Sequence, residues 1–236
     1  GRKTRAQADA LRAAQELLAQ IAPPVNPLLP VQATGTRPSR ALPYELHVSA
    51  RCDGLRGRVK LIFANTGDAA AVFHVYDRFN LDRLPRRYMV ERNERLDDEW
   101  AATTDNAGKY DLWVLGPNGF HRHFKGDLNT LKSRGAPEPE IRVGYEVRRG
   151  DIHLKVRNDG ERACWFTVTA KAYLQGRDDR TWRVKVKGGE DAEKRWDLDD
   201  SGQACGSDPT WSRRFAGRVE TGRHSVSDPA MGTAGN

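Results

Sequence analysis

The amino-acid sequence predicts an all-β fold: two tandem antiparallel immunoglobulin-like β-sandwiches, preceded by one N-terminal helix and a proline-rich connector. Three observations support this fold class. The sequence from about Tyr44 to Asp127 is repeated from about Glu140 to Arg218. In both copies apolar residues alternate with polar ones, which is typical of half-buried strands. Each copy holds about six or seven such short runs without room for crossover helices, which favours an antiparallel sandwich.

Two stretches of each copy show the repeat most clearly. The run from Val59 to Gly67 matches the run from Ile152 to Gly160, and the same offset aligns Phe73 with Phe166. Near the end of each copy, Phe120-His121-Arg122-His123-Phe124-Lys125-Gly126 matches Trp211-Ser212-Arg213-Arg214-Phe215-Ala216-Gly217. Only small loop changes separate the two copies, so the chain is predicted to be a tandem pair.

The predicted domain boundaries follow from this alignment. Residues 1–43 form the helix and connector, residues 44–128 the first sandwich, residues 129–139 a linker, and residues 140–236 the second sandwich with a C-terminal tail. The linker has the composition of an extended connection, with Gly135, Pro137 and Pro139.

Residues Arg5 to Ile21 are predicted to form one amphipathic helix. Small and apolar residues recur there at helical spacing: Ala8, Leu11, Ala14, Leu18 and Ile21. Pro23 and Pro24 end the helix, because proline lacks the backbone donor and disfavours a helical residue before it. We expect the helix to dock on something upstream or outside the chain. A membrane-surface helix is the alternative, which an alanine-rich face without aromatic residues disfavours.

The expected strands of the first copy are marked by alternating apolar residues: Leu46 and Val48; Val59, Leu61 and Phe63; Phe73 and Val75; Tyr88 and Val90; Tyr110, Leu112 and Val114; Phe120 and Phe124. Asn118-Gly119 predicts a tight hairpin before the last strand, because these residues tolerate the positive backbone angles that such a turn requires.

The expected strands of the second copy are marked in the same way: Ile141, Val143, Tyr145 and Val147; Ile152, Leu154 and Val156; Phe166 and Val168; Trp182, Val184 and Val186. Arg183, Lys185 and Lys187 alternate with the last set, and we expect them on a solvated sheet face. Nothing from Asp197 to Ser207 matches Tyr110 to Val114 of the first copy. We therefore expect a loop or a short irregular edge there instead of a regular strand.

The composition limits the possible partners. The chain has 236 residues, a formal net charge of +7 and a pI near 9.5, which favours anionic partners such as phospholipid surfaces, nucleic acid or an acidic protein face. Basic residues are scattered over both copies without a recognised nucleic-acid signature, so nucleic acid is not predicted as a partner. No run approaches the roughly 18 apolar residues of a membrane span, and no apolar signal core follows the basic first residues.

The three cysteines, Cys52, Cys164 and Cys205, have neither zinc-finger nor dithiol spacing. Their odd number leaves at least one thiol unpaired. Cys164 lies in a strand-like run and is interpreted as a buried free thiol. A bridge between Cys52 and Cys205 stays open on the sequence.

No catalytic, cofactor or metal site is predicted. His121 and His123 project from the same face of a strand, but with no third ligand evident we expect two surface histidines and no metal. The acidic run Asp197, Asp199 and Asp200 lacks the spacing of a calcium loop. Ser225, Ser227, His224 and Asp228 lie close in sequence, but no nucleophile elbow surrounds the serines, so a hydrolytic triad is not expected.

One surface contact is predicted around a tryptophan. Trp113 lies between Leu112 and Val114, so its side chain should point away from the core that they enter. Indole combines an apolar body with a polar edge and suits an interface. Four basic residues are expected to accompany Trp113 in this contact: Arg86, Arg87, Arg122 and Lys125.

Several motifs resemble the C-terminal domain that is repeated at the end of bacterial phosphocholine-preferring phospholipases C. They are the runs Gly35 to Leu46, Asn65 to Gly67, Phe73 to Tyr76, Pro85 to Tyr88, Gly108 to Leu112, Gly116 to Phe120 and, most specifically, Phe215 to Pro229. The resemblance covers most of the chain. It implies a parent enzyme whose active site lies in a larger, phosphatase-like N-terminal domain, with the helix and connector as the junction.

The resemblance implies that this chain alone is not an enzyme. It would be the non-catalytic end of a secreted or periplasmic phospholipase C acting on phosphatidylcholine and sphingomyelin. Its expected partners are the catalytic domain of the same polypeptide, a phospholipid membrane surface, or a helper protein. The alternative is a protein-interaction module for folding, export or a helper protein, without lipid binding.

Overall fold

The computed structural model describes residues 4–19, 35–172, 181–196, 203–207 and 211–226. The chain divides into two compact units, one of which runs from Arg37 to Ser227 and contains both repeats. The other unit contains α1 (Arg5–Ala19), which confirms the predicted N-terminal helix. Thr4 and Gln7 cap its start reciprocally: the Gln7 amide donates to Thr4 Oγ1 and the Thr4 amide donates to Gln7 Oε1. Residues 20–34 of the predicted helix and connector lie outside the described residues, whereas residues 35–43 of the connector are described.

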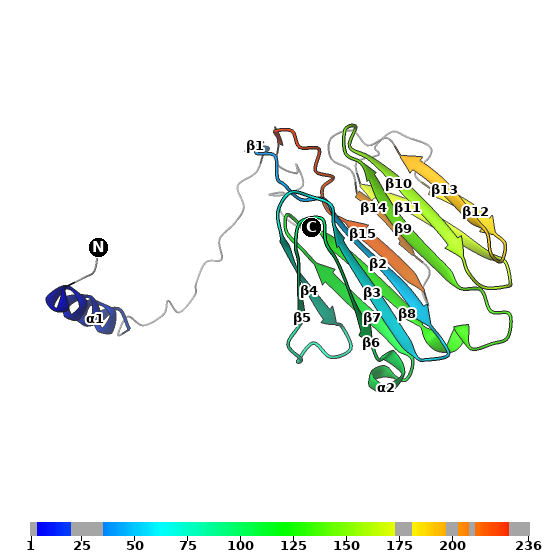
Figure 1. Ribbon diagram of the computed structural model, residues 1–236, viewed down its shortest axis with the longest axis horizontal. Coiled ribbons are helices and arrows are strands. Elements are labelled where there is room, and N and C mark those ends of the chain that lie inside the picture. The colour runs from blue at the N-terminus through cyan, green and yellow to red at the C-terminus, as the bar shows by residue number, and fades with distance from the viewer. Residues whose placement is uncertain (1–3, 20–34, 173–180, 197–202, 208–210, 227–236) are drawn as a thin grey trace. The chain divides into compact units, whose positions relative to one another are not determined.

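Each repeat contributes seven strands to an antiparallel framework (Figure 1). In the first repeat these are β2 (Leu46–Asp53), β3 (Arg58–Asn65), β4 (Ala71–Asp77), β5 (Arg86–Val90), β6 (Arg95–Trp100), β7 (Lys109–Leu115) and β8 (His121–Asp127). In the second they are β9 (Pro139–Glu146), β10 (Asp151–Asn158), β11 (Cys164–Ala172), β12 (Thr181–Val186), β13 (Asp191–Trp196), β14 (Gln203–Ser207) and β15 (Ser212–Ala216).

Four short elements complete the described part of this unit. The helix α2 (Ala102–Asn106) lies between β6 and β7, and the 3-10 helix η1 (Leu128–Leu131) follows β8. The two-residue strands β1 (Pro38–Ser39) and β16 (Ser225–Val226) pair with each other. The β1–β16 pair therefore ties the start of this unit to its end.

One continuous eight-stranded sheet runs through both repeats, in the order β12-β11-β14-β15-β8-β7-β4-β5. The second layer consists of two three-stranded sheets, β6-β3-β2 in the first repeat and β9-β10-β13 in the second. Each repeat is thus a two-layer sandwich, which confirms the predicted fold class. The two repeats are not structurally separate, because hydrogen bonds between β8 and β15 join their larger sheets into one continuous sheet.

The joining strands relate the repeats by an approximate two-fold axis. The order of the eight strands reads the same from either end when each strand is exchanged for its counterpart in the other repeat. His123 of β8 pairs with its own counterpart, Arg214 of β15, while Arg122 pairs with Phe215 and Arg213 with Phe124. The axis passes between His123 and Arg214, so equivalent ends of the two sandwiches point in opposite directions.

Each sandwich has its own apolar core, built from the inward residues of its two layers. The first core centres on Leu61, Phe63, Phe73, Val75, Leu112 and Phe124, and the second on Ile141, Leu154, Val156, Phe166, Val168, Trp196 and Phe215. The alternation seen in the sequence accounts for these sets, because successive side chains of a strand point to opposite faces. Trp100 and Trp196, which lie at corresponding places in the two repeats, are both buried.

The repeated Asn-x-Gly motif is a structural device. Asn65 and Asn158 are fully buried at the ends of β3 and β10. The side-chain nitrogen of Asn65, Nδ2, donates to the carbonyl oxygens of Ala69 at 2.8 Å and Val90 at 3.1 Å. Its side-chain oxygen, Oδ1, accepts from the backbone amide of Gly67 at 3.0 Å. Asn158 makes the equivalent three bonds. One side chain thereby satisfies three buried backbone groups.

The predicted hairpin between β7 and β8 is present. Asn118 and Gly119 have φ values of 51° and 72°, the positive angles that a tight two-residue turn requires. The Phe120 amide donates to the Pro117 carbonyl oxygen at 3.0 Å, and the Gly116 amide donates to the Phe120 carbonyl oxygen at 2.8 Å.

The region after Trp196 contains a regular strand, so the expectation of a loop or an irregular edge was wrong. The strand β14 pairs with β11 on one side and with β15 on the other, inside the eight-stranded sheet. Among the described residues of this region, the pairing of β14 with β11 has one irregularity, a register shift between Thr169 and Ala172. Strand pairing on both sides fixes the backbone here, although the sequence lacks an alternating pattern.

Two thiols are free. Cys52 and Cys164 are half-buried and unpaired, so Cys52 does not form the bridge to Cys205 that the sequence left open. Cys52 is instead held in the junction between the repeats, where its thiol donates to the Tyr110 hydroxyl at 3.2 Å. Burial raises the pKa of Cys52.

A buried ion pair lies at this junction. The guanidinium of Arg213, on β15, donates to both carboxylate oxygens of Glu140, on β9, at 2.8 and 2.9 Å, and to the Tyr110 hydroxyl at 3.0 Å. Arg213 also donates to the Lys125 carbonyl oxygen on β8. Although burial favours the neutral form, the charge of Glu140 raises the pKa of Arg213 well above its usual value. Residues from both repeats thus share one polar cluster.

Candidate interaction surface

The outward face of the eight-stranded sheet contains three of the five predicted contact residues. Cross-strand pairing sets this face: Arg87 of β5 lies opposite His74 of β4, and Trp113 of β7 lies opposite His123 of β8. Lys125 lies two residues further along β8 and therefore shares the face. The structure brings Arg87, Trp113 and Lys125 onto one side of the sheet, away from both cores.

Trp113 points away from the core, but neighbouring side chains cover much of it. The Arg78 guanidinium lies 4.4 Å from the centre of the indole ring, and the rings of His121 and His123 meet it edge to face at 6.1 Å. Arg78 also donates to the Asp111 carboxylate. Trp113 is half-buried in this cluster, so its exposed edge rather than its whole ring is available for contact.

Arg86 and Arg122 occupy the opposite face of the sheet. Arg86 is exposed at the edge of the first sandwich, where it lies 4.0 Å over the Trp100 ring and forms an ion pair with Asp98 at 2.9 Å. Arg122 is only 3% exposed. The expectation that Arg122 contributes to a surface contact was therefore wrong, because it shares the inward face of β8 with Phe124.

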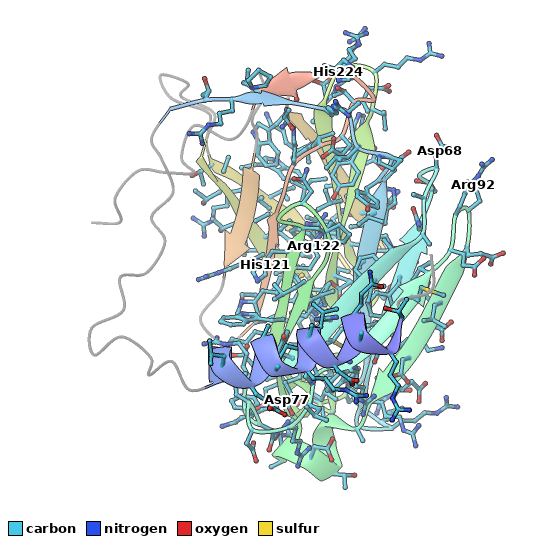
Figure 2. All side chains as sticks on the ribbon, turned by 90° about the vertical axis from the view of Figure 1, so that its left-hand side faces the viewer. Asp68, Asp77, Arg92, His121, Arg122 and His224 are labelled. Atoms are coloured by element: carbon cyan, nitrogen blue, oxygen red, sulfur yellow. The ribbon has the colours of Figure 1, made fainter. Side chains whose placement is uncertain are left out.

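Arg122 belongs to the junction between the repeats (Figure 2). It donates to the carbonyl oxygens of His121 and Ala216, each at 2.8 Å, and to the Tyr145 hydroxyl. The guanidinium stacks 3.9 Å over the Phe120 ring. Burial lowers the pKa of Arg122. It thus occupies the position on β8 that Arg213 occupies on β15.

The two histidines of β8 differ in environment. His123 is 5% exposed and its Nε2 lies 2.6 Å from Asp111 Oδ1, so it is not the surface histidine that the sequence suggested. Desolvation by burial lowers the pKa of His123 in spite of the Asp111 charge, and it also lowers the pKa of His121. The described residues contain no group of three or more side chains able to hold a metal ion.

Asp111 is the residue that sequence reasoning missed in this cluster. The sequence contained a signal for it: Asp111 and Trp113 are two residues apart on one strand, so their side chains are expected on the same face. Four large apolar side chains on the same outward face were also not singled out: Val72, Met89, Leu115 and Trp165, with exposed fractions of 44, 62, 39 and 58%. The face is therefore both apolar and basic.

A second candidate region is a cleft of about 530 Å³ between the repeats, on the side of the smaller sheets. Its lining includes Cys52, Tyr110 and Glu140 of the junction cluster. Four of its eight charged lining residues form ion pairs: Lys155 with Asp191 and Glu193, Arg157 with Asp159, and Glu140 with Arg213. The lining carries charges of both signs, so it favours neither an anionic nor a cationic ligand.

His224 and Ser225, which are the described members of the serine and histidine group near the C-terminus, form hydrogen bonds within the same unit. His224 Nδ1 accepts from the Ala41 amide at 3.2 Å, and Ser225 Oγ accepts from Arg218. These contacts fasten the C-terminal segment to the start of the sandwich pair. Asp197, Asp199, Asp200, Ser227 and Asp228 lie outside the described residues.

A family model described as "Bacterial phospholipase C, C-terminal domain" matches residues 38–127 and 139–218. The chain belongs to this family. The two matched segments coincide with the two sets of seven strands. The likeness therefore extends over both sandwiches and includes the joining strands.

Curated relatives of this phospholipase C domain chain include two non-hemolytic phospholipases C. That of Pseudomonas aeruginosa is 43% identical over 234 residues, which is 96% of this chain and 33% of the relative. That of Burkholderia pseudomallei is 43% identical and covers 90% of this chain and 30% of the relative. A hemolytic phospholipase C of Pseudomonas aeruginosa is 33% identical over 87% of this chain and 31% of the relative.

The chain spans about a third of the length of the curated relatives that it matches. It corresponds to their C-terminal domain region, as the family model states. Within the described part of the chain, neither helix has the length and apolar character needed to cross a bilayer.

Proposed function

We propose that this chain is the non-catalytic C-terminal region of a secreted bacterial phospholipase C that acts on phosphatidylcholine and sphingomyelin. It supports the catalytic domain of the same polypeptide, either by docking to it or by holding it at a membrane. Membership of the family of phospholipase C C-terminal domains carries this proposal. The chain's coverage of about a third of its relatives leaves room for a separate catalytic part.

The outward sheet face gives the proposal a physical basis. Arg87, Arg183, Lys185 and Arg214 are exposed there, next to the exposed apolar side chains of Met89 and Trp165. Each basic residue close to an anionic lipid surface contributes roughly 1 kcal/mol, so several together give measurable attraction. The same mixture of apolar and basic groups also suits a contact with an acidic protein face.

Co-sedimentation with vesicles tests the membrane part of the proposal. The chain is mixed with vesicles of phosphatidylcholine alone, or of phosphatidylcholine with phosphatidylserine, at low and high salt. Binding that increases with phosphatidylserine and decreases with salt supports membrane positioning by the basic face. Absence of binding to every vesicle rejects it and favours the alternative, an interaction module for folding, export or a helper protein.

The non-catalytic part is tested by assaying the purified chain for phosphodiesterase activity on phosphatidylcholine and sphingomyelin. We expect no turnover above that of a heat-denatured sample. Turnover that follows the chain through successive purification steps would overturn this part of the proposal.

A further inference from the structure

One end of the first sandwich exposes four large apolar side chains on two loops. Leu55 lies in the turn between β2 and β3 and is 93% exposed. Phe79, Leu81 and Leu84 lie in the loop between β4 and β5, with exposed fractions of 50, 59 and 89%. We name these four residues the apolar end. Their gathering at one end of the sandwich makes this end a candidate contact surface.

The two loops belong to the same end of the molecule because α2 connects them. On one side, the Thr103 amide donates to the Gly57 carbonyl oxygen at 3.1 Å. On the other side, the Asn106 side chain bonds to Asn80 at 3.0 Å and to Asp77 at 3.2 Å. The helix has only five residues, or roughly 8 Å at 1.5 Å per residue, so the loops are close neighbours.

The loop between β4 and β5 is held in shape by its own polar groups. Asp77 is 7% exposed and accepts from the Phe79 amide at 3.0 Å and from the Asn80 side chain at 2.7 Å. The Arg83 amide donates to the Asn80 carbonyl oxygen at 3.1 Å. The loop therefore presents its apolar side chains to solvent in a preorganised shape, which reduces the entropy lost on binding.

The apolar end lies opposite the place where the preceding chain enters. The paired strands β1 and β16 lie at the other end of the sandwich pair from α2 (Figure 1). Figure 2 shows the same polarity, with Asp77 near the apolar end and Asp68, Arg92 and His224 toward the other. The apolar end and the β1–β16 pair therefore lie at opposite ends of this unit.

The charge around the apolar end is nearly balanced. Exposed Arg56 and Arg83 are accompanied by exposed Asp82 and Asp105, and Arg56 is already near Asp53 at 3.7 Å. Such a surface is only weakly attracted to an anionic membrane, because its positive and negative charges nearly cancel. It is compatible with the headgroup region of a zwitterionic membrane. The apolar side chains also stand on separate loops with the polar α2 between them. A fluid lipid interface accommodates separate insertions better than a protein interface, which needs a contiguous apolar centre.

We propose that the apolar end inserts into the interfacial region of a zwitterionic phospholipid bilayer through Leu55, Phe79, Leu81 and Leu84. This inference rests on the proposed membrane role and adds a contact with zwitterionic lipid to the contact that the outward sheet face would make with anionic lipid. Because insertion is driven by apolar burial, the binding is insensitive to salt.

The double variant Leu55→Ser/Leu84→Ser tests the inference, since both side chains are almost fully exposed and their loss leaves the fold intact. The matched control is Leu96→Ser/Val226→Ser, which removes two side chains that are 38 and 50% exposed and lie outside both candidate membrane contacts. Partitioning of each chain onto phosphatidylcholine vesicles is measured at low and high salt. We expect the test variant to partition at least about tenfold less than the wild-type chain, because burial of one leucine contributes about a factor of ten or more.

The outcomes separate the inference from the proposed function. If the wild-type chain binds vesicles and the test variant binds equally well, the apolar end is not the membrane contact, although the membrane role survives. If the wild-type chain binds no vesicle, both fail. If the wild-type chain self-associates in sedimentation velocity and the test variant does not, the apolar end contacts a second copy and the inference is overturned.

A direct measurement of insertion complements the partitioning. In the variant Leu84→Trp, the added indole should be quenched by phospholipids brominated on the acyl chains, beyond the quenching of the native tryptophans in the wild-type chain. Equal fractional quenching of the variant and the wild-type chain on saturating vesicles would contradict insertion of this loop.

Discussion

Arg122 and Arg213 occupy equivalent positions on the two strands that join the repeats, and both are buried. Arg213 binds the carboxylate of Glu140, whereas Arg122 binds two backbone carbonyl oxygens and the hydroxyl of Tyr145. The pKa of Arg213 is accordingly raised and that of Arg122 lowered. Two equivalent arginines therefore stabilise one junction in different ways, Arg213 through an ion pair and Arg122 through hydrogen bonds to neutral groups.

Replacement of Arg213 by methionine should destabilise the fold by about 3–5 kcal/mol, because it leaves the Glu140 carboxylate buried without its counter-charge. The variant Arg214→Met is the matched control, since Arg214 is the next residue of β15 and is exposed. It should change stability by no more than about 0.5 kcal/mol. Urea unfolding of both variants measures the difference, and equal midpoints would show that the ion pair does not stabilise the junction.

The Asn-x-Gly device predicts matching losses in the two repeats. Asn65→Ala and Asn158→Ala should each lower stability by about 2–4 kcal/mol, because an unpaired buried backbone group costs ~1–3 kcal/mol. Thr66→Ala, at an exposed neighbouring position, serves as the control and should have a small effect. Urea unfolding is again the measurement. A loss for Asn65→Ala no larger than that of the control would refute the assigned role.

Gly126 leaves room for the junction hydroxyl. A Cβ atom on Gly126 would lie 2.3 Å from the Tyr110 hydroxyl oxygen, and Tyr110 is held in place by Arg213. We expect Gly126→Ala to destabilise the fold by about 1–3 kcal/mol through overpacking. Combined with Tyr110→Ala, which removes the hydroxyl oxygen together with the ring carbons that would lie 2.5 and 2.8 Å from the added Cβ, Gly126→Ala should cost less than it does alone. Strict additivity in this double-mutant cycle would argue against the clash.

The histidines of β8 predict a loss of stability in acid. Burial lowers the pKa of His123 and His121 in the folded chain, so the unfolded chain binds protons at higher pH than the folded chain does. The stability that these two neutral histidines contribute is fully present above the pKa of an ordinary histidine, about 6.5. It is lost as the pH falls through the lowered pKa values that they have in the folded chain.

The unfolding free energy of the wild-type chain should therefore fall from pH 7.5 to pH 5. The variant His121→Gln/His123→Gln should show a smaller fall, since two of the titrating groups are gone. Urea unfolding across this pH range measures both slopes. Parallel slopes for the two chains would remove these histidines as the cause.

The strands with regular alternation could be predicted from the sequence, and two others could not. Val59, Leu61 and Phe63 alternate with polar residues, and β3 is present as predicted. The strand β6 contains the run Arg95 to Trp100 and buries only Trp100, so it has no period-two signal. Its conformation depends on pairing with β3. The strand β14 likewise depends on its two neighbours, which no local pattern reveals.

The candidate surface was predicted in part. The alternation of side chains between the two faces of a strand explains why the face of Trp113 was predicted correctly and why that of Arg122 was not. Trp113 was assigned to the outward face because its neighbours enter the core. The same argument places Arg122 between two outward histidines, on the inward face, and Arg86 in phase with Tyr88. The pairing of β8 with β15 was beyond prediction, because it joins residues that lie far apart in sequence and depends on how the two sandwiches meet.

The self-paired register of β8 and β15 is the geometry of an isologous homodimer contained in one chain. In a true homodimer every substitution appears twice, so a carboxylate introduced beside one arginine would also appear beside its twin. Covalent fusion removes that constraint. The position held by Glu140 in the second repeat is held by His47 in the first, and each half of the junction can vary alone. The fused pair can therefore keep a symmetric arrangement of strands while its two halves carry different side chains, as Glu140 and His47 do.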